Sequence, residues 1–300
     1  MGEAVFVDLL DPDEEALRRA APGDVVPADV WQALRPPGDA RPRIVARSGY
    51  VSAVLLVAVA VPAEDRVYYQ ELDLLAFADH LVLVRKTPPD GEPFDTQPVH
   101  ESCRPGDPPG QVVGVLLDTV AERYLELVDD LDGEIGELED ELEHASPREV
   151  GRRIADLRHD ILRIRKTLTP TRDAVRRLVD GRINEEAGRD VITHEGEMKL
   201  ADVYDKLLRA TESLDFARDS VASARDYHQS LVANQQNEVM KRLAVVASLL
   251  LLPTFIVGVY GQNFDHMPEL HWQLGYLFSW LVIAATTVGQ LAFFRWKRWL

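Results

Sequence analysis

The chain has 300 residues, a length typical of about two domains. Its 33 Lys and Arg residues against 50 Asp and Glu give a formal net charge of −17, which argues against nucleic acid as a partner because phosphate-binding surfaces need a surplus of cations. The single cysteine, Cys103, cannot form an internal disulfide, so a disulfide-built extracellular module is excluded as well.

Residues 1–110 are predicted to form a small α/β domain. Apolar, β-branched runs predict strands at residues 5–10, 49–62 and 79–87, and an acidic start predicts a short helix at 11–21. The Pro- and Gly-rich stretch 87–110 predicts a linker or irregular loop. The sequence has no Gly-rich nucleotide loop, nucleophile elbow or HExxH motif, so the chain is not predicted to be an enzyme and needs no organic cofactor.

Residues 111–242 are predicted to be helical, beginning with two apolar stripes of alternating four- and three-residue spacing. The stripes are Leu131, Ile135, Leu138 and Leu142, and then Val150, Ile154, Leu157, Ile161, Ile164 and Leu168. Together with the break at Ser146-Pro147 they predict an antiparallel helical hairpin. Residues 121–145 hold eleven acids and one base, and residues 147–182 hold eleven bases and five acids, so the helices attract each other. The alternative for the acidic run is a solvated face.

A third helical pattern runs without interruption from Leu200 to Leu231. No Pro or Gly falls between Lys199 and the middle of the apolar run that follows, so one continuous helix is predicted over residues 198–260. At 1.5 Å per residue it extends about 95 Å, far more than a bilayer accommodates. The excess predicts a cytoplasmic stalk in mechanical continuity with a membrane span.

Two apolar runs close the chain. Residues 243–260 and 276–294 contain no charged side chain, and each approaches the ~20 residues that a transmembrane helix needs. Two buried core helices are the alternative, but runs this apolar on all faces favour a bilayer. Lys and Arg precede the first run and follow the second, whereas the loop 261–275 between the runs has neither. Both termini are therefore expected in the cytoplasm and the loop outside.

These segments together predict an α+β membrane protein in three parts. They are a cytoplasmic α/β domain (1–110), a cytoplasmic helical hairpin and stalk (111–242), and a two-helix transmembrane domain in the cell membrane (243–300). The acidic N-terminus lacks a basic and apolar leader, so no signal peptide is expected.

The end of the first span carries a specific motif. Residues 260–270 read YGQNFDHMPEL, and upstream lie NEVMK at 237–241, PTF at 253–255 and ADVYD at 201–205. In this pattern the chain resembles the CorA magnesium and cobalt channel family, in which Tyr-Gly-Met-Asn-Phe ends the first span and Met-Pro-Glu-Leu follows. Gln262 stands where that family most often has Met, which leaves the ion preference open.

The resemblance implies a homopentamer in the bilayer, with the first span of each subunit lining a pore for divalent cations. The family's pore positions fall on Asn237, Met240, Leu243, Ala247, Leu251, Thr254 and Asn263, with Tyr260, Gly261 and Gln262 at the mouth. This face is polar at its ends and mostly apolar between them, and an apolar constriction can close a pore by dewetting. Two spans cannot enclose a pore alone, so packing of the spans against each other is the alternative reading.

The implied filter suits Mg²⁺, which dehydrates reluctantly. A ring of Asn263 amide oxygens with the Gly261 carbonyls can hydrogen-bond the ion's waters, and Asp265 and Glu269 of the loop can concentrate cations at the mouth. No ATPase motif is present, so the membrane potential is the expected driving force.

The resemblance also implies inhibition by cytoplasmic Mg²⁺ bound between subunits. Asp202 stands at the family's sensing aspartate, and its partner is expected at Glu64 or Asp65 of the adjacent subunit, whereas a solvated aspartate on a charged helix is the alternative. Two other functions stay open: a zinc transporter resembling the ZntB branch, for which His266 and His271 are candidate ligands, and a membrane-anchored sensor that does not conduct.

Overall fold

The computed structural model describes residues 5–20, 30, 34, 41–47, 49–61, 66–89, 91–104, 106–180, 191, 194–262 and 267–299. The chain divides into two compact units, Met1–Arg225 and Asp226–Leu300, and the boundary between them falls within a single long helix.

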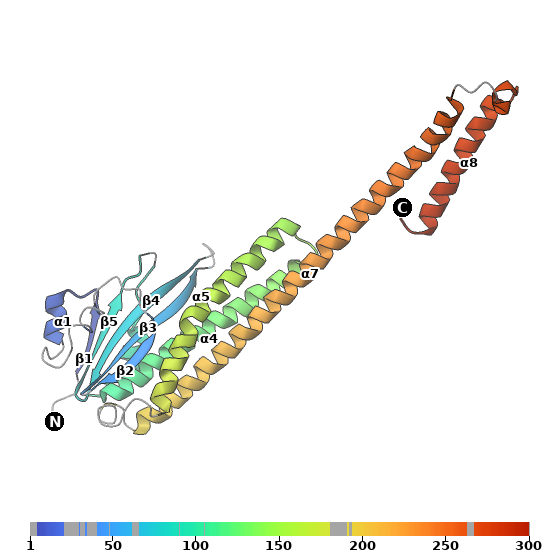
Figure 1. Cartoon of the computed structure of the whole chain (residues 1–300). Coiled ribbons are helices and arrows are strands. Elements are labelled where there is room, and N and C mark those ends of the chain that lie inside the picture. Colours follow the sequence, from blue (N-terminus) through green and yellow to red (C-terminus); the bar gives the residue numbers. More distant parts are fainter. Residues whose placement is uncertain are drawn as a thin grey trace. The chain divides into compact units, whose positions relative to one another are not determined.

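The first unit is built on a five-stranded sheet (Figure 1). Its strands are β1 (Val5–Leu10), β2 (Arg43–Arg47), β3 (Tyr50–Val61), β4 (Arg66–Phe77) and β5 (His80–Lys86). The spatial order is β1-β5-β4-β3-β2, and β1 runs parallel to β5 while the other neighbours are antiparallel. The predicted strands at 5–10, 49–62 and 79–87 are confirmed within one or two residues.

The strands β2 and β4 were not predicted, although β4 lies at the centre of the sheet. Glu71 and Asp73 interrupt the apolar pattern of β4, and a carboxylate inside a sheet is costly unless it is paired. The structure supplies the pair from β5, because Lys86 Nζ lies 2.6 Å from Glu71 Oε1 and 2.7 Å from Asp73 Oδ2. The strand therefore depends on a cross-strand contact that its own pattern does not reveal.

Two antiparallel helices, α4 (Pro109–Glu141) and α5 (Pro147–Val179), form the predicted hairpin (Figure 1). Both apolar stripes are buried in one core with the face of the sheet that carries Leu55, Leu72 and Leu83. Ser146 begins α5 by accepting a hydrogen bond from the Glu149 amide, and Arg153 of α5 lies 2.7 Å from Glu141 of α4. The opposite face of the sheet packs on α1 (Glu14–Ala20) through Leu17.

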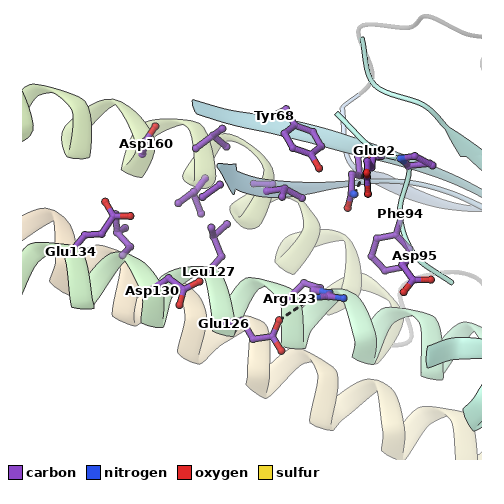
Figure 2. A pocket seen from close by; sticks show the side chains of 18 residues that line it. Tyr68, Glu92, Phe94, Asp95, Arg123, Glu126, Leu127, Asp130, Glu134 and Asp160 are labelled. Carbon is purple, nitrogen blue, oxygen red and sulfur yellow. Dashed lines mark hydrogen bonds and ion pairs between the residues drawn. The ribbon is translucent and has the colours of Figure 1, made fainter. Parts of the chain in front are cut away.

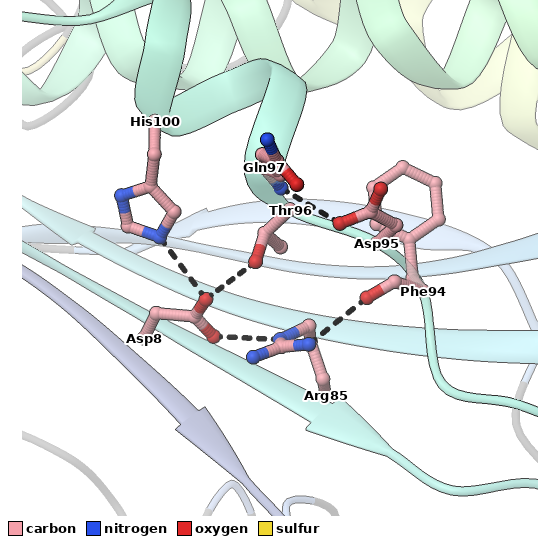
Figure 3. A network of polar contacts seen from close by, with 7 residues as sticks. All are labelled: Asp8, Arg85, Phe94, Asp95, Thr96, Gln97 and His100. Atoms are coloured by element: carbon pink, nitrogen blue, oxygen red, sulfur yellow. Dashed lines mark hydrogen bonds and ion pairs between the residues drawn. The ribbon is translucent and has the colours of Figure 1, made fainter.

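The stretch 87–110, predicted as a linker, contains the short helix α3 (Gln97–Ser102), and α4 begins within it at Pro109. A buried carboxylate holds this stretch on the sheet (Figure 3). Asp8 of β1 accepts hydrogen bonds from Arg85 (2.8 Å) and Thr96 (2.7 Å), and His100 Nε2 lies 3.2 Å away. Burial would raise the pKa of Asp8, but these three partners hold it below its usual value. The predicted irregular loop is thus wrong at α3, because long-range hydrogen bonds order a Pro-rich segment.

The predicted continuous helix is confirmed as α7 (His194–Tyr260), which begins four residues earlier than expected. Its stripe in the first unit, from Leu200 to Ala224, is buried in the core with α4 and α5. The second unit contains the rest of α7, the 3₁₀ turn η2 (Pro268–His271) and α8 (Gly275–Trp296). The apolar C-terminal part of α7 and the whole of α8 are each long enough to cross a membrane.

Candidate functional site

One face of α7 in the second unit carries the residues expected to line a pore. Asn237, Met240, Leu243, Ala247, Leu251 and Thr254 are all exposed, and Leu251 reaches 71%. The side of α7 covered within the unit is a different one, centred on Val245, which is 1% exposed, with Ser248 and Leu252 half-buried. The single chain therefore leaves the expected pore face uncovered, together with the sides of the helix that carry Val246, Leu250 and Phe255.

The end of α7 presents two of the expected mouth residues to solvent. The Gly261 amide donates to the Val257 carbonyl (2.9 Å) and the Gln262 amide to the Val259 carbonyl (3.3 Å), so the helical path continues just beyond Tyr260. Gly261 and Gln262 are exposed, while Tyr260 is half-buried. Asn263 and Asp265, expected at the filter and the mouth, lie outside the described residues.

The loop returns to the second span through η2, which carries the expected carboxylate Glu269 in an exposed position. A close backbone contact holds this turn against the start of α8. A Cβ atom on Gly275 would lie 2.1 Å from the Glu269 carbonyl oxygen, so only glycine fits there without moving the turn. Gly275 thereby sets where Glu269 stands relative to the span.

The expected sensing residue Asp202 lies exposed on α7 in the first unit, and among the described residues it has no hydrogen bond or ion pair. One helical turn further, Lys206 Nζ contacts two carboxylates of α4, Asp118 Oδ1 at 2.5 Å and Glu122 Oε1 at 3.0 Å. Burial would lower the pKa of Lys206, but these hydrogen bonds raise it above its usual value. The expected partners Glu64 and Asp65 lie outside the described residues.

A cleft of about 310 Å³ opens in the first unit between the sheet and the hairpin (Figure 2). Its floor is apolar, with Leu127, Leu131 and Phe94, and its rim is acidic. The rim carboxylates belong to Glu92, Asp95, Glu126, Asp130, Glu134 and Asp160, and Arg123 contributes the positive charge there. Within the described parts of the chain, no three His, Cys, Asp or Glu side chains converge as a metal site.

Sequence reasoning missed Lys206, the acidic cleft and a polar residue inside the second span, Gln290. The four-residue spacing of Asp202 and Lys206 and the lone amide in an apolar run were visible signals. The cleft had none, because its walls come from strands and helices far apart in the sequence.

The family described as CorA-like Mg²⁺ transporter protein matches residues 2–298 of the chain. The cobalt/magnesium transport protein CorA of Thermotoga maritima is 34% identical over 62% of this chain and 51% of its own length. A protein of the same name from Methanocaldococcus jannaschii is 28% identical over 62% of this chain and 56% of its own length. The chain thus spans about half of these curated relatives.

Among solved structures, the complete CorA magnesium transporter from Methanocaldococcus jannaschii has a similar fold. The TM-score is 0.79 at 20% sequence identity, covering 98% of this chain and 91% of the other. The cytoplasmic domain of ZntB from Vibrio parahaemolyticus also matches, with a TM-score of 0.56 over 76% of this chain at 12% identity. Both comparisons concern the fold. The complete transporter supports the predicted α+β architecture with two C-terminal spans, and the cytoplasmic domain supports the part that precedes them.

Proposed function

This chain belongs to the CorA-like Mg²⁺ transporter family, and from that premise we propose that it is a homopentameric channel for Mg²⁺ influx that also carries Co²⁺. The observation that carries the proposal is the uncovered face of α7. It runs from Asn237 through Leu243, Ala247 and Leu251 to Thr254, polar at the ends and apolar in the middle. Five copies of this face around an axis make a pore whose apolar middle closes by dewetting.

The selective part of the proposed pore is a ring of Asn263 side chains beside the Gly261 carbonyls. Mg²⁺ keeps its waters in most protein sites, and amide oxygens can accept hydrogen bonds from those waters without replacing them. Asp265 and Glu269 contribute two carboxylates per subunit at the mouth, which raise the local concentration of cations. With both termini in the cytoplasm, the membrane potential drives a divalent ion inward by about 4.6 kcal/mol per 100 mV.

The experiment is divalent flux into proteoliposomes that contain the purified full-length chain. We expect Mg²⁺ uptake that depends on the imposed potential and falls to background in Asn263→Ala. Asn234→Ala is the matched control, because Asn234 is an exposed amide of α7 outside the proposed pore positions. Zn²⁺ uptake in place of Mg²⁺ would favour a zinc transporter, and no uptake of either ion would favour a non-conducting sensor. Normal Mg²⁺ uptake by Asn263→Ala would refute the filter assignment.

We further propose that Mg²⁺ at Asp202 holds the channel closed, with Glu64 or Asp65 of the neighbouring subunit as its other ligand. Asp202 is exposed and has no hydrogen bond or ion pair to another described residue, which supports this role, whereas Lys206 already compensates Asp118 and Glu122 one turn away. Bound Mg²⁺ would cancel the repulsion between subunits, and its loss would let the stalk of α7 move the gate.

Substitutions at Asp202 test this regulation. Asp202→Lys should mimic the cation and favour closure, and Asp202→Ala should weaken inhibition by internal Mg²⁺ without abolishing flux. Asp205→Ala is the control, an exposed carboxylate of the same helix that plays no part in the proposal. If both Asp202 variants keep the wild-type dependence on internal Mg²⁺, Asp202 is a solvated surface residue and not the sensor.

A further inference from the structure

Gln290 is a polar side chain in the last third of the apolar helix α8, which is long enough to cross a membrane. It lies in α8 within the uncharged run 276–294 and is half-buried. A polar side chain in hydrocarbon is expensive, and it is usually kept for a specific contact. A leucine at this position would suit the bilayer better, so the contact that Gln290 makes must account for its presence.

Gln290 reaches from α8 to α7 through its side-chain amide nitrogen. Its Nε2 donates to the Ser248 hydroxyl at 2.9 Å and to the Ser248 backbone carbonyl at 3.2 Å. Its Oε1 is buried without a hydrogen-bond partner among the described residues. The Gln290 amide therefore leaves one of its hydrogen-bonding groups unpaired, and that costs stability. A purely stabilising role explains the presence of Gln290 poorly.

The turn that Gln290 contacts adjoins a gap in the backbone hydrogen bonds of α7. Pro253 has no amide hydrogen, so the carbonyl of Leu249 loses its partner four residues ahead. The two neighbouring carbonyls receive side-chain donors in addition to their backbone partners: Ser248 from Gln290, and Leu250 from the Thr254 hydroxyl at 2.7 Å. Side chains thus support the backbone on both sides of the gap left by the proline, as polar groups do around prolines in membrane helices.

The same contact bears on which side of α7 faces the pore. Successive residues of an α-helix are about 100° apart, so Ser248 lies about a quarter turn from Ala247 on the proposed pore face. A hydrogen bond from α8 to Ser248 fixes the rotation of α7 about its axis at the level of the apolar constriction. It also ties the register of the two spans to that turn, because Gln290 bonds both the hydroxyl and the carbonyl of Ser248.

We propose that Gln290 is a positioning residue that braces the proline-interrupted turn of α7 and holds the pore face in its conducting orientation. This inference rests on the proposed channel function, although the brace itself is a property of the second unit alone. Gln290 does not touch the ion, so its loss should lower the maximal flux and leave the concentration of external Mg²⁺ at half-saturation unchanged.

The test compares Gln290→Leu with Thr286→Val in the full-length protein. Thr286 is the matched control, because its hydroxyl donates to the Val282 and Ile283 carbonyls of its own helix and to no other described residue. Maximal Mg²⁺ flux per assembled channel should fall about three- to tenfold in Gln290→Leu, in line with measured interhelical hydrogen bonds in membranes. Amide hydrogen exchange of the α7 segment 245–256 should become faster in that variant, and Thr286→Val should match the wild type in both measurements.

A graded variant keeps the test decisive if Gln290→Leu fails to assemble. Ser248→Ala removes one acceptor and keeps the backbone carbonyl, so it should give a smaller effect in the same direction. Unchanged exchange in both variants would overturn the brace. If the variants exchange faster but the wild-type protein conducts no divalent ion, the brace is supported and the channel is refuted. The two failures are therefore distinguishable.

Discussion

The buried carboxylate Asp73 offers a prediction whose sign and size follow from the structure. Asp73 is 1% exposed in the central strand β4, with Lys86 Nζ at 2.7 Å. Burial raises the pKa of Asp73 from 3.8 to about 6, although Lys86 lowers it. Replacing it in Asp73→Asn removes the titration and keeps the shape. Lys86 is not left alone by this change, because Glu71 remains 2.6 Å away.

The raised pKa makes the stability of the folded state depend on pH in a defined direction. Between pH 3.8 and about 6 the folded state holds the proton of Asp73 more tightly than the unfolded state does. The contribution of Asp73 is therefore most favourable below pH 3.8 and is lost as the pH rises through about 6. A difference of about two pKa units corresponds to about 3 kcal/mol, or about 6–12 °C in Tm for a unit of this size.

The assay is thermal unfolding of the full-length wild type and Asp73→Asn in detergent, followed by circular dichroism between about pH 4 and pH 7. We expect the variant to gain about 2–3 kcal/mol of stability relative to the wild type as the pH rises over this range. Other groups titrate in both proteins and cancel in the difference. Parallel pH profiles, or a wild type that gains on the variant as the pH rises, would refute the reasoning.

Two further predictions concern the mouth of the proposed pore. Gln262→Met should change the relative uptake of Mg²⁺, Co²⁺, Ni²⁺ and Zn²⁺ by no more than about tenfold, or 1.4 kcal/mol, because an exposed amide is exchanged for a soft thioether beside an unchanged Asn263. Competition flux assays measure this change. A complete switch of ion would make Gln262 a principal ligand. Gly275→Ala should lower flux and thermal stability, because its Cβ would meet the Glu269 carbonyl oxygen. Gly289→Ala is the control, because its Cβ would meet nothing within 4 Å and should change neither flux nor stability. Equal effects of the two variants would contradict the proposed role of Gly275.

Helical parts of this chain were predictable because helix formation depends on periodicity within one segment. The stripe from Leu200 onward predicted α7, and the two stripes around Ser146 predicted α4 and α5, since each helix closes its own backbone hydrogen bonds. The apolar runs predicted both spans for the same reason. The motif around Gly261 pointed to the family, which the match over residues 2–298 confirms.

The sequence by itself therefore determined the long helices, three of the five strands, the apolar runs and the family, whereas the tertiary structure decided strands β2 and β4, helix α3 and the contacts between elements. Strand β4 depends on Lys86, and α3 depends on Asp8, which lies 88 residues from Thr96. Gln290 is readable as unusual in the sequence, but its partner Ser248 lies 42 residues away. Sheet pairing and buried polar contacts join segments that are far apart in the sequence. Their free energy depends on a partner that the local sequence pattern does not contain, so the pattern cannot predict them.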